Sequence, residues 1–395
     1  MVMVAKSSAS AIFEPGEQLV MNFEGAPGTF SVKFWTNYGG KFEVPVPLNL
    51  CAEGRGPAHS LDDAVERFAN AARAGSTILA LVANADLGLL QPEVVFDASP
   101  ERDQHEFLQV IIPEQPLRAV PSRRIDVEVA TAVGTSLSAH PELIRLRRAI
   151  AQYSVALSMW NPGHEIQCLA HLYMGVEALT KAQLRQHLVD RGLFEDQLVQ
   201  EWQIEKKQLD AEVRRRLILL QDQEAYVKAK AVSDGLEHGF SEYGEMRPPA
   251  REVIVRTARH LRRAILDMLK LEERLRVKLT SEDFKEPRGP ITLVRYLRGT
   301  LSGQADKLAM SDQLYPIMEW RGGLKSVVRG ADGKYGFTTD EGFTPKLGEG
   351  VTFTPIRFEI WDGSSIQDMP KASFAQPAVS DRGRPEGIDL SPTAK

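Results

Sequence analysis

The chain has 395 residues, of which 43% are hydrophobic and 26% charged, and its formal net charge is -5. These values are typical of a soluble globular protein of two or three domains, and they exclude a disordered, collagen-like or strongly basic chain. The two cysteines, Cys51 and Cys168, are far apart in the sequence, which excludes a disulfide framework and favours a reducing, cytoplasmic location. Because no apolar run is long enough to span a membrane and the chain does not start with a secretory signal pattern, we expect no membrane partner.

The N-terminal part begins with a predicted β-hairpin. Apolar residues alternate with polar ones between residues 30 and 50, and Gly39 and Gly40 interrupt the alternation as a turn would. Pro45 and Pro47 lack a backbone N–H, so they indicate that the second strand lies at a sheet edge or leaves the sheet irregularly.

A helix is expected after the hairpin, followed by two more strands. Ser60 is a good N-cap, and Asp62 and Asp63 in the first turn favour the helix dipole. The strand candidates cover residues 93–97 and 106–112, so this part of the chain is predicted to form a small α+β domain.

The middle of the chain has few prolines and long patterns with the 3.6-residue period of a helix. Five helices are expected: one beginning at Pro141, one after residues 161–163, one across 195–221, one after Asp222 and one after Pro248 and Pro249. Their short connections predict an antiparallel bundle. The shared core is predicted to contain Leu146, Ile150, Leu172, Val176, Val232, Leu261 and Ile265.

Glycine and proline return from about residue 286, and the pattern becomes that of short strands. The strand candidates are residues 291–296, 323–329, 335–338, 350–354 and 356–361. The predicted fold class is therefore α+β and multidomain. Its parts are an N-terminal α+β domain (1–122), a helical bundle (123–282), a β-rich segment (283–370) and a disordered tail (371–395).

Three short segments of the helical middle carry a resemblance to a known family. They are residues 147–160, residues 172–179 and the segment from Ser233 to Gly239, which ends in His-Gly. Together they resemble the HEPN family, most closely its Apea-like branch. The resemblance implies a homodimer in which an Arg and a His from each subunit surround an RNA phosphate.

One position departs from the family pattern. His238 matches the catalytic His and Asp234 the polar residue, but Ser233 stands where the Arg is expected. Cleavage by a 2′-hydroxyl needs a proton acceptor and a cation for the charge on the phosphoryl oxygens. Lys230 and Arg247 are the candidate replacement cations, although Lys does not reproduce the bidentate contacts of Arg.

Glu177 interrupts an apolar run. It is either a buried carboxylate with a partner, for which His238 is the candidate, or a residue with a structural hydrogen bond or at a helix edge nearer to water. The plainer interpretation of His238 is a residue at a helix end that bonds a backbone carbonyl. His164, Cys168 and His171 share one helix face at a spacing that zinc could use, but without a second Cys/His pair we predict no metal and no cofactor. The basic run at residues 214–216 has acidic neighbours and favours a self-paired, solvated surface.

Three functions remain open from the sequence. The first is a non-catalytic HEPN-like protein of prokaryotic or phage origin that binds and dimerises, with RNA or a nucleotide as a further partner. The second is a metal-independent HEPN ribonuclease of a defence or toxin system. The third is a structural or assembly protein in which the helices only form a packed core.

Overall fold

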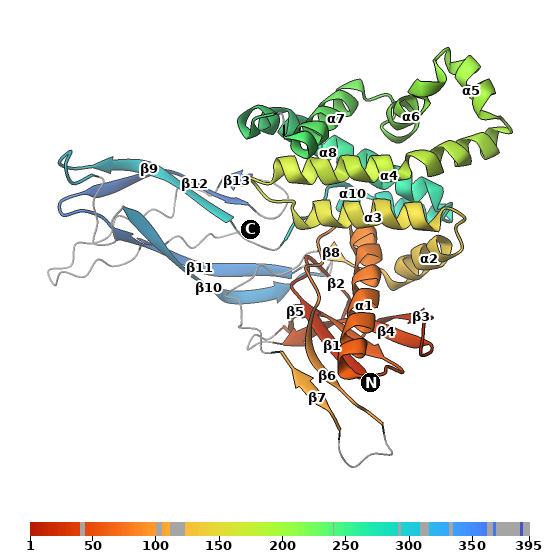
Figure 1. Ribbon diagram of the computed structural model, residues 1–395. Helices are drawn as coiled ribbons and strands as arrows, with labels where there is room; N and C mark the ends of the chain where they lie inside the picture. The colour runs from red at the N-terminus through yellow and green to blue at the C-terminus, as the bar shows by residue number, and fades with distance from the viewer. Residues whose placement is uncertain are drawn as a thin grey trace. The chain divides into compact units, whose positions relative to one another are not determined.

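The computed structural model describes residues 1–39, 44–99, 105–110, 123–239, 241–290, 294–308, 316–331, 335–361, 366–368 and 388–389 (Figure 1). The chain divides into two compact units. The first contains Met1–Asn37, Leu48–Ile112 and Arg123–Pro290, and the second contains Tyr38–Pro47, Pro113–Ser122 and Ile291–Lys395. The N-terminal sheet and the helices thus belong to one unit. None of the described helices has both the length and the apolar content that crossing a membrane requires.

The first unit contains a six-stranded sheet with α1 across one face (Figure 1). In spatial order the strands are β3 (Leu19–Phe23), β4 (Phe30–Gly39), β5 (Val46–Arg55), β1 (Val2–Ser7), β6 (Gln91–Phe96) and β7 (Phe107–Gln109). A short parallel pair, β2 (Ala11–Ile12) and β8 (Arg123–Arg124), lies outside this sheet. The expected alternation is present, because Phe30, Val32 and Phe34 are all buried.

The edge position predicted for the second hairpin strand is wrong. β5 lies between β4 and β1, so it is an inner strand and not an edge strand. Pro47 is only the second residue of β5, where its missing N–H costs little of the ladder. Residues 40–43, with part of the expected turn, lie outside the described residues.

Helix α1 (Leu61–Ala83) begins where the sequence predicts. The Ser60 hydroxyl accepts a hydrogen bond from the Asp63 N–H at 3.2 Å. The buried side of the helix contacts the sheet through Phe68. A Cβ added to Gly54 would lie 2.5 Å from the Cβ of Phe68. Gly54 therefore allows the helix to approach β5 closely.

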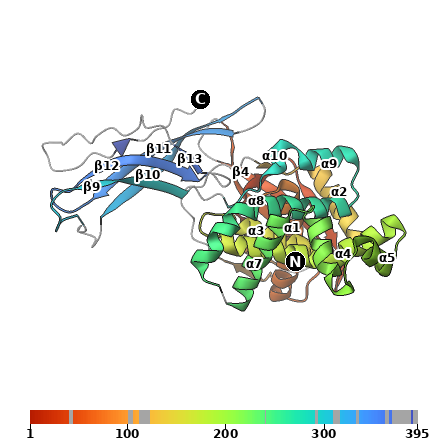
Figure 2. The same cartoon turned by 90° about the horizontal axis from the view of Figure 1, so that it is seen from above.

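The helical part follows in the same unit. Its elements are α2 (Val127–Ser138), α3 (Leu143–Ser158), α4 (Glu165–Arg191), α5 (Glu195–Trp202), the 3₁₀ turn η1 (Lys206–Gln208), α6 (Leu209–Val213), the π-helical turn η2 (Arg214–Ile218), α7 (Gln223–His238), α8 (Tyr243–Met268), α9 (Glu273–Thr280) and α10 (Glu282–Lys285). α4 contacts α3, α7 and α8, which surround it (Figure 2). The predicted core is confirmed, because all of its members are at most 1% exposed: Leu146, Ile150, Leu172, Val176, Val232, Leu261 and Ile265.

Three helical predictions need correction. α2 was not predicted, and the region 195–221 is a series of short elements instead of one helix. α8 begins at Tyr243, so Pro248 and Pro249 lie inside it. The prolines lack the N–H groups that would bond the carbonyls of Gly244 and Glu245, but both of these residues are exposed to solvent. Buried Met246 packs the first turns of α8 against α7.

Two buried arginines from outside α1 bind its carboxyl end. Arg262 of α8 donates through Nε to the Leu81 carbonyl at 3.0 Å and through Nη2 to the Val82 carbonyl at 3.1 Å. Arg123 of β8 donates through Nη1 to the Ala83 carbonyl at 3.0 Å. The last carbonyls of a helix lack partners within the helix and carry partial negative charge, so both arginines stabilise this end. Burial lowers the pKa of Arg123 to about 9 and the pKa of Arg262 to about 10, which leaves both charged at neutral pH.

The same arginines hold the chain that follows the last helices. Arg262 Nη1 donates to the Leu279 carbonyl at 2.7 Å, and Arg123 Nη2 donates to the Glu286 carbonyl at 2.6 Å. The sheet, the bundle and the segment leading to residue 290 are thus joined at the end of α1.

Asn84, the C-cap of α1, adds two side-chain contacts at this junction. Its backbone is left-handed, with φ of 48°. Its amide donates to the Phe284 carbonyl at 2.8 Å, and its side-chain oxygen accepts from the Tyr153 hydroxyl at 2.5 Å. Burial is the main reason why the pKa of Tyr153 is raised, so this hydroxyl keeps its proton to donate.

The second unit is β-rich, as predicted. It contains β9 (Val294–Ser302), β10 (Ile317–Arg329), β11 (Tyr335–Lys346), β12 (Thr352–Trp361), β13 (Ile366–Asp368) and β14 (Ile388–Asp389), in the sheets β10-β11-β14 and β13-β12-β9. The candidates at 350–354 and 356–361 are one strand, β12. Most of the predicted disordered tail, residues 371–387 and 390–395, lies outside the described residues.

Replacing Arg262 with Met should lower the free energy of unfolding by about 2–5 kcal/mol, because it leaves buried helix-end carbonyls without donors. Arg274→Met is the matched control. Its side chain is 60% exposed, and the carboxylates that it pairs with, Glu128 and Glu272, are 48% and 71% exposed, so its loss should cost less than about 1 kcal/mol. Equal losses in denaturant titrations of the two variants would contradict the role of Arg262.

Gly175 and Gly134 should respond in opposite directions to alanine. A Cβ on Gly175 of α4 would lie 2.6 Å from Cδ2 of buried Leu261, whereas a Cβ on Gly134 of α2 would meet nothing within 4 Å. Gly175→Ala should therefore destabilise the protein by about 1–3 kcal/mol, and Gly134→Ala should stabilise it by about 0.5–1 kcal/mol. Thermal melting of the two variants measures both effects, and stabilisation by Gly175→Ala would show that α4 and α8 are not in close contact there.

Candidate functional site

The segment that resembles the HEPN motif forms the second half of α7. Asp222 caps the start of this helix by accepting from the Ala225 N–H at 3.0 Å. The helix ends at His238, where Gly239 takes a left-handed conformation with φ of 66°. Glycine adopts this conformation without a steric penalty, so its position explains where the helix stops.

The residue at the arginine position of the motif is buried. Ser233 is 3% exposed, and Gly235 lies close to Ser241 and Met246 of the following segment. The side of α7 that carries Gly235 therefore packs against the start of α8. A side chain at position 233 points away from solvent. An RNA phosphate would approach from the solvent side.

The candidate cations near the motif are bound to carboxylates. Lys230 forms an ion pair with Asp234, one turn further along α7. Arg247 of α8 lies 3.9 Å from Glu165 at the start of α4, and Arg251 shares that carboxylate at 2.9 Å. Burial works against ionisation of Glu165, but backbone N–H groups at the helix start and Arg251 outweigh it and lower its pKa.

The expected buried contact between Glu177 and His238 is wrong. Both side chains are exposed, and the Glu177 carboxylate lies 2.7 Å from Nη1 of Arg214. Arg214, in the π-helical turn η2, also donates to the Thr180 hydroxyl at 3.1 Å and lies 3.4 Å from the Tyr173 hydroxyl. Glu177 thus belongs to a contact between α4 and η2. Glu177 interrupts the apolar run because it lies at the edge of the buried stripe of α4.

Cys168 and His171 on α4 have partners of their own. The Cys168 thiol donates to the Ala156 carbonyl at 3.2 Å, and burial raises the pKa of this thiol well above its usual range. His171 Nδ1 lies 2.7 Å from the side-chain oxygen of Gln152. Within the part of the chain that the structure describes, no group of three His, Cys, Asp or Glu residues is arranged to hold a metal ion.

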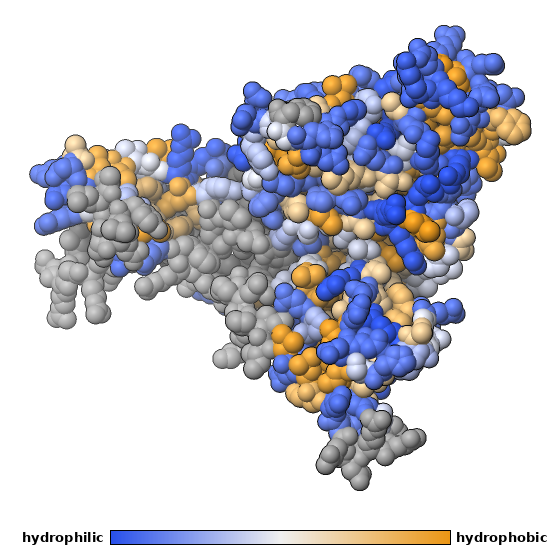
Figure 3. All heavy atoms as spheres, viewed as in Figure 1, coloured by the Kyte–Doolittle hydropathy of each residue, from blue (hydrophilic) through white to orange (hydrophobic). Residues whose placement is uncertain are grey.

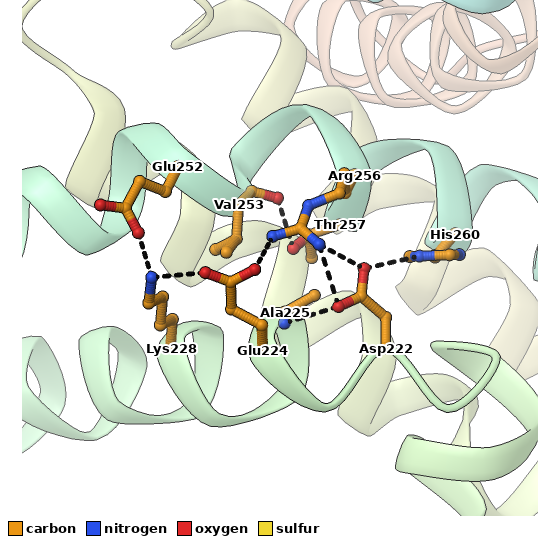
Figure 4. Close-up of polar contacts among 9 residues, drawn as sticks. All are labelled: Asp222, Glu224, Ala225, Lys228, Glu252, Val253, Arg256, Thr257 and His260. Atoms are coloured by element: carbon orange, nitrogen blue, oxygen red, sulfur yellow. Dashed lines mark hydrogen bonds and ion pairs between the residues drawn. The ribbon is translucent and has the colours of Figure 1, made fainter.

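The densest polar contacts in this region join α7 to α8, and the sequence did not single them out (Figure 4). Both carboxylate oxygens of Asp222 accept from Nη1 of Arg256, at 3.2 and 3.1 Å. His260 Nε2 lies 3.3 Å from the same carboxylate. A signal was present, because Asp222 reads as an N-cap and Arg256 and His260 share one face of the next helix.

A second carboxylate extends these contacts along the two helices. Glu224 accepts from Arg256 Nη2 at 2.6 Å and from Lys228 at 2.7 Å, and Lys228 also contacts Glu252. Hydrogen bonds from Lys228 and Arg256 lower the pKa of Glu224 to about 2. These groups bind one another and hold the start of α7 on α8. Among the described residues the ring of His260 has no partner besides Asp222, so the pair lacks the hydroxyl or thiol that a nucleophilic triad needs.

Comparisons with family models, with curated proteins and with solved structures each gave no match for this chain. Arguments about its function therefore depend on its own residues.

Acidification should weaken the α7–α8 contact through His260. Burial is the main reason why the pKa of His260 lies below its usual value. The unfolded chain then takes up the proton first, so the contribution of His260 to stability is lost as pH falls below about 6.5. Wild-type protein should lose more unfolding free energy between pH 7.5 and pH 5.5 than the His260→Gln variant does.

Comparing the two proteins isolates His260 from other titrating groups. His171 and His187 also have pKa values lowered by burial, while burial raises the pKa of Asp86 to about 6 and gives the opposite trend. These groups are present in both proteins. An identical pH dependence of wild type and variant in denaturant titrations would refute the role of His260.

Proposed function

We propose that the protein is a HEPN-like helical binding module that does not cleave RNA and that works as a homodimer in a reducing cytoplasm. The single observation that carries the lack of cleavage is the burial of Ser233 at the arginine position. The buried core shared by α3, α4, α7 and α8 supports the resemblance to a HEPN bundle. Both cysteines are buried free thiols, which fits a reducing compartment.

The electrostatics of the motif argue against catalysis. In-line attack on a phosphodiester develops negative charge on the phosphoryl oxygens, and loss of one stabilising donor typically costs about 10²–10³ in rate. Lys230 is neutralised by Asp234, and exposed Glu237 adds negative charge beside His238. His238 is accessible as a base but has no unpaired cation beside it in the motif.

The experiment is a cleavage assay on single-stranded RNA with EDTA present. We expect no cleavage above background by wild-type protein, and no change in the His238→Ala variant, because the motif has no cation to stabilise the developing charge. Lys230→Ala is the matched control at the nearest cation. Robust cleavage by the wild type that disappears in His238→Ala would make the ribonuclease of a defence or toxin system the correct function.

A further inference from the structure

The three most exposed large apolar side chains of the described residues belong to three neighbouring helices. Ile144 at the start of α3 is 70% exposed, Val189 near the end of α4 is 75% exposed, and Phe194 just before α5 is 77% exposed. Apolar side chains exposed singly are ordinary, but a group of them on one surface indicates an interface.

Ion pairs and a tight turn place these residues at one end of the bundle. Glu142, before α3, binds Arg185 of α4 at 2.6 Å, so the start of α3 lies beside the end of α4. Gly192 then ends α4 with φ of 63°, and the Leu193 N–H bonds the Leu188 carbonyl at 3.0 Å, which folds α5 back. Figures 1 and 2 both show α5 beyond the end of α4, and Figure 3 shows apolar side chains gathered over that end.

This end is a packed surface. Leu184, Leu198, Leu209 and Val213 form a small buried core beneath it. A rigid surface loses little conformational entropy on binding, which favours its use as an interface.

Two arginines beside Ile144 stand out from the other arginines of the helices. Arg147 and Arg148 lie three and four residues after Ile144, on the same side of α3; both are exposed and neither has a carboxylate partner among the described residues. Buried Arg262 binds carbonyls. The remaining arginines from α3 to α9 all have carboxylate partners: Arg145, Arg185, Arg191, Arg214, Arg215, Arg216, Arg247, Arg251, Arg256, Arg259, Arg263, Arg274 and Arg276.

Carboxylates of the opposite charge are available on the same end. Glu195 and Asp196 lie in the first turn of α5, next to Phe194, and both are exposed. Glu195 has no ion pair among the described residues. Asp196 pairs with Lys206, but the two side chains are 81% and 68% exposed, so this contact is weak and readily exchanged.

We propose that this end of the bundle is the interface with a second copy of the chain. Ile144, Val189 and Phe194 form its apolar centre, and Arg147 and Arg148 of each copy bind Glu195 and Asp196 of the other. A two-fold contact repeats each interaction twice, so it requires a surface that complements itself, and this surface carries both signs around an apolar centre. Glu195 and Asp196 would repel a nucleic acid. The inference rests on the proposed function and names the partner and the surface of that module.

Light scattering and sedimentation of the full chain test the apolar centre. Wild-type protein should be a dimer at micromolar concentration. Val189→Ser with Phe194→Ser should raise the dissociation constant at least tenfold without changing the circular dichroism spectrum. Val227→Ser is the matched control, because Val227 is 50% exposed on α7, away from this end, and should leave the dimer unchanged.

Charge reversal separates a second copy from any other partner. Arg147→Glu with Arg148→Glu should weaken the dimer at least tenfold, and so should Glu195→Lys with Asp196→Lys. A chain carrying all four changes should dimerise again, since the opposite charges then meet with exchanged signs. A monomeric wild type, or a quadruple variant no stronger than either double variant, would overturn the interface. RNA cleavage by a dimer that behaves as expected would overturn only the proposed function.

Discussion

The arrangement of the first unit depends on the hydrogen bonds that the backbone carbonyls at the carboxyl end of α1 accept. Four residues from Leu81 to Asn84 present carbonyls at this end, and Arg262 and Arg123 come from distant parts of the chain to bind them. The same guanidinium groups bind the carbonyls of Leu279 and Glu286. Among the described residues neither arginine forms an ion pair with a carboxylate, so the favourable interaction is with peptide dipoles, which are already aligned by the helix and cost little reorganisation.

Two arginines of α8 bind backbone carbonyls at the ends of other helical elements. Beside Arg262, Arg263 donates to the carbonyls of Leu217 and Ile218, both at 3.2 Å, where the π-helical turn η2 ends. A guanidinium suits such positions because its planar donors reach several carbonyls at once and its charge persists when it is buried. α8 therefore binds the ends of two other helices as well as contributing a buried face to the bundle.

Helix geometry explains why the α7 motif separates into a buried and an exposed residue. Positions 233 and 238 are five residues apart, which turns the side chain by about 140° around the axis. Ser233 is buried in the bundle, and His238 at the last turn is exposed to solvent. The chemistry at this site is thus determined by which side of α7 the bundle covers, and the α7–α8 contacts of Asp222, Arg256 and His260 hold that side in place.

Local features of the sequence were enough to predict much of this fold. The 3.6-residue period identified α3, α4 and their core, Ser60 marked the start of α1, and one interpretation of His238 placed it at a helix end, because periodicity and caps act within a few residues. The tertiary structure alone decided the long-range partners of polar groups. A charged residue such as Arg262 reads as surface in the sequence, yet its acceptor at Leu81 is 181 positions away. The sequence likewise left open whether Glu177 is buried, and its partner, Arg214, comes from another element. Such contacts depend on which segments meet in space, and no local pattern encodes that.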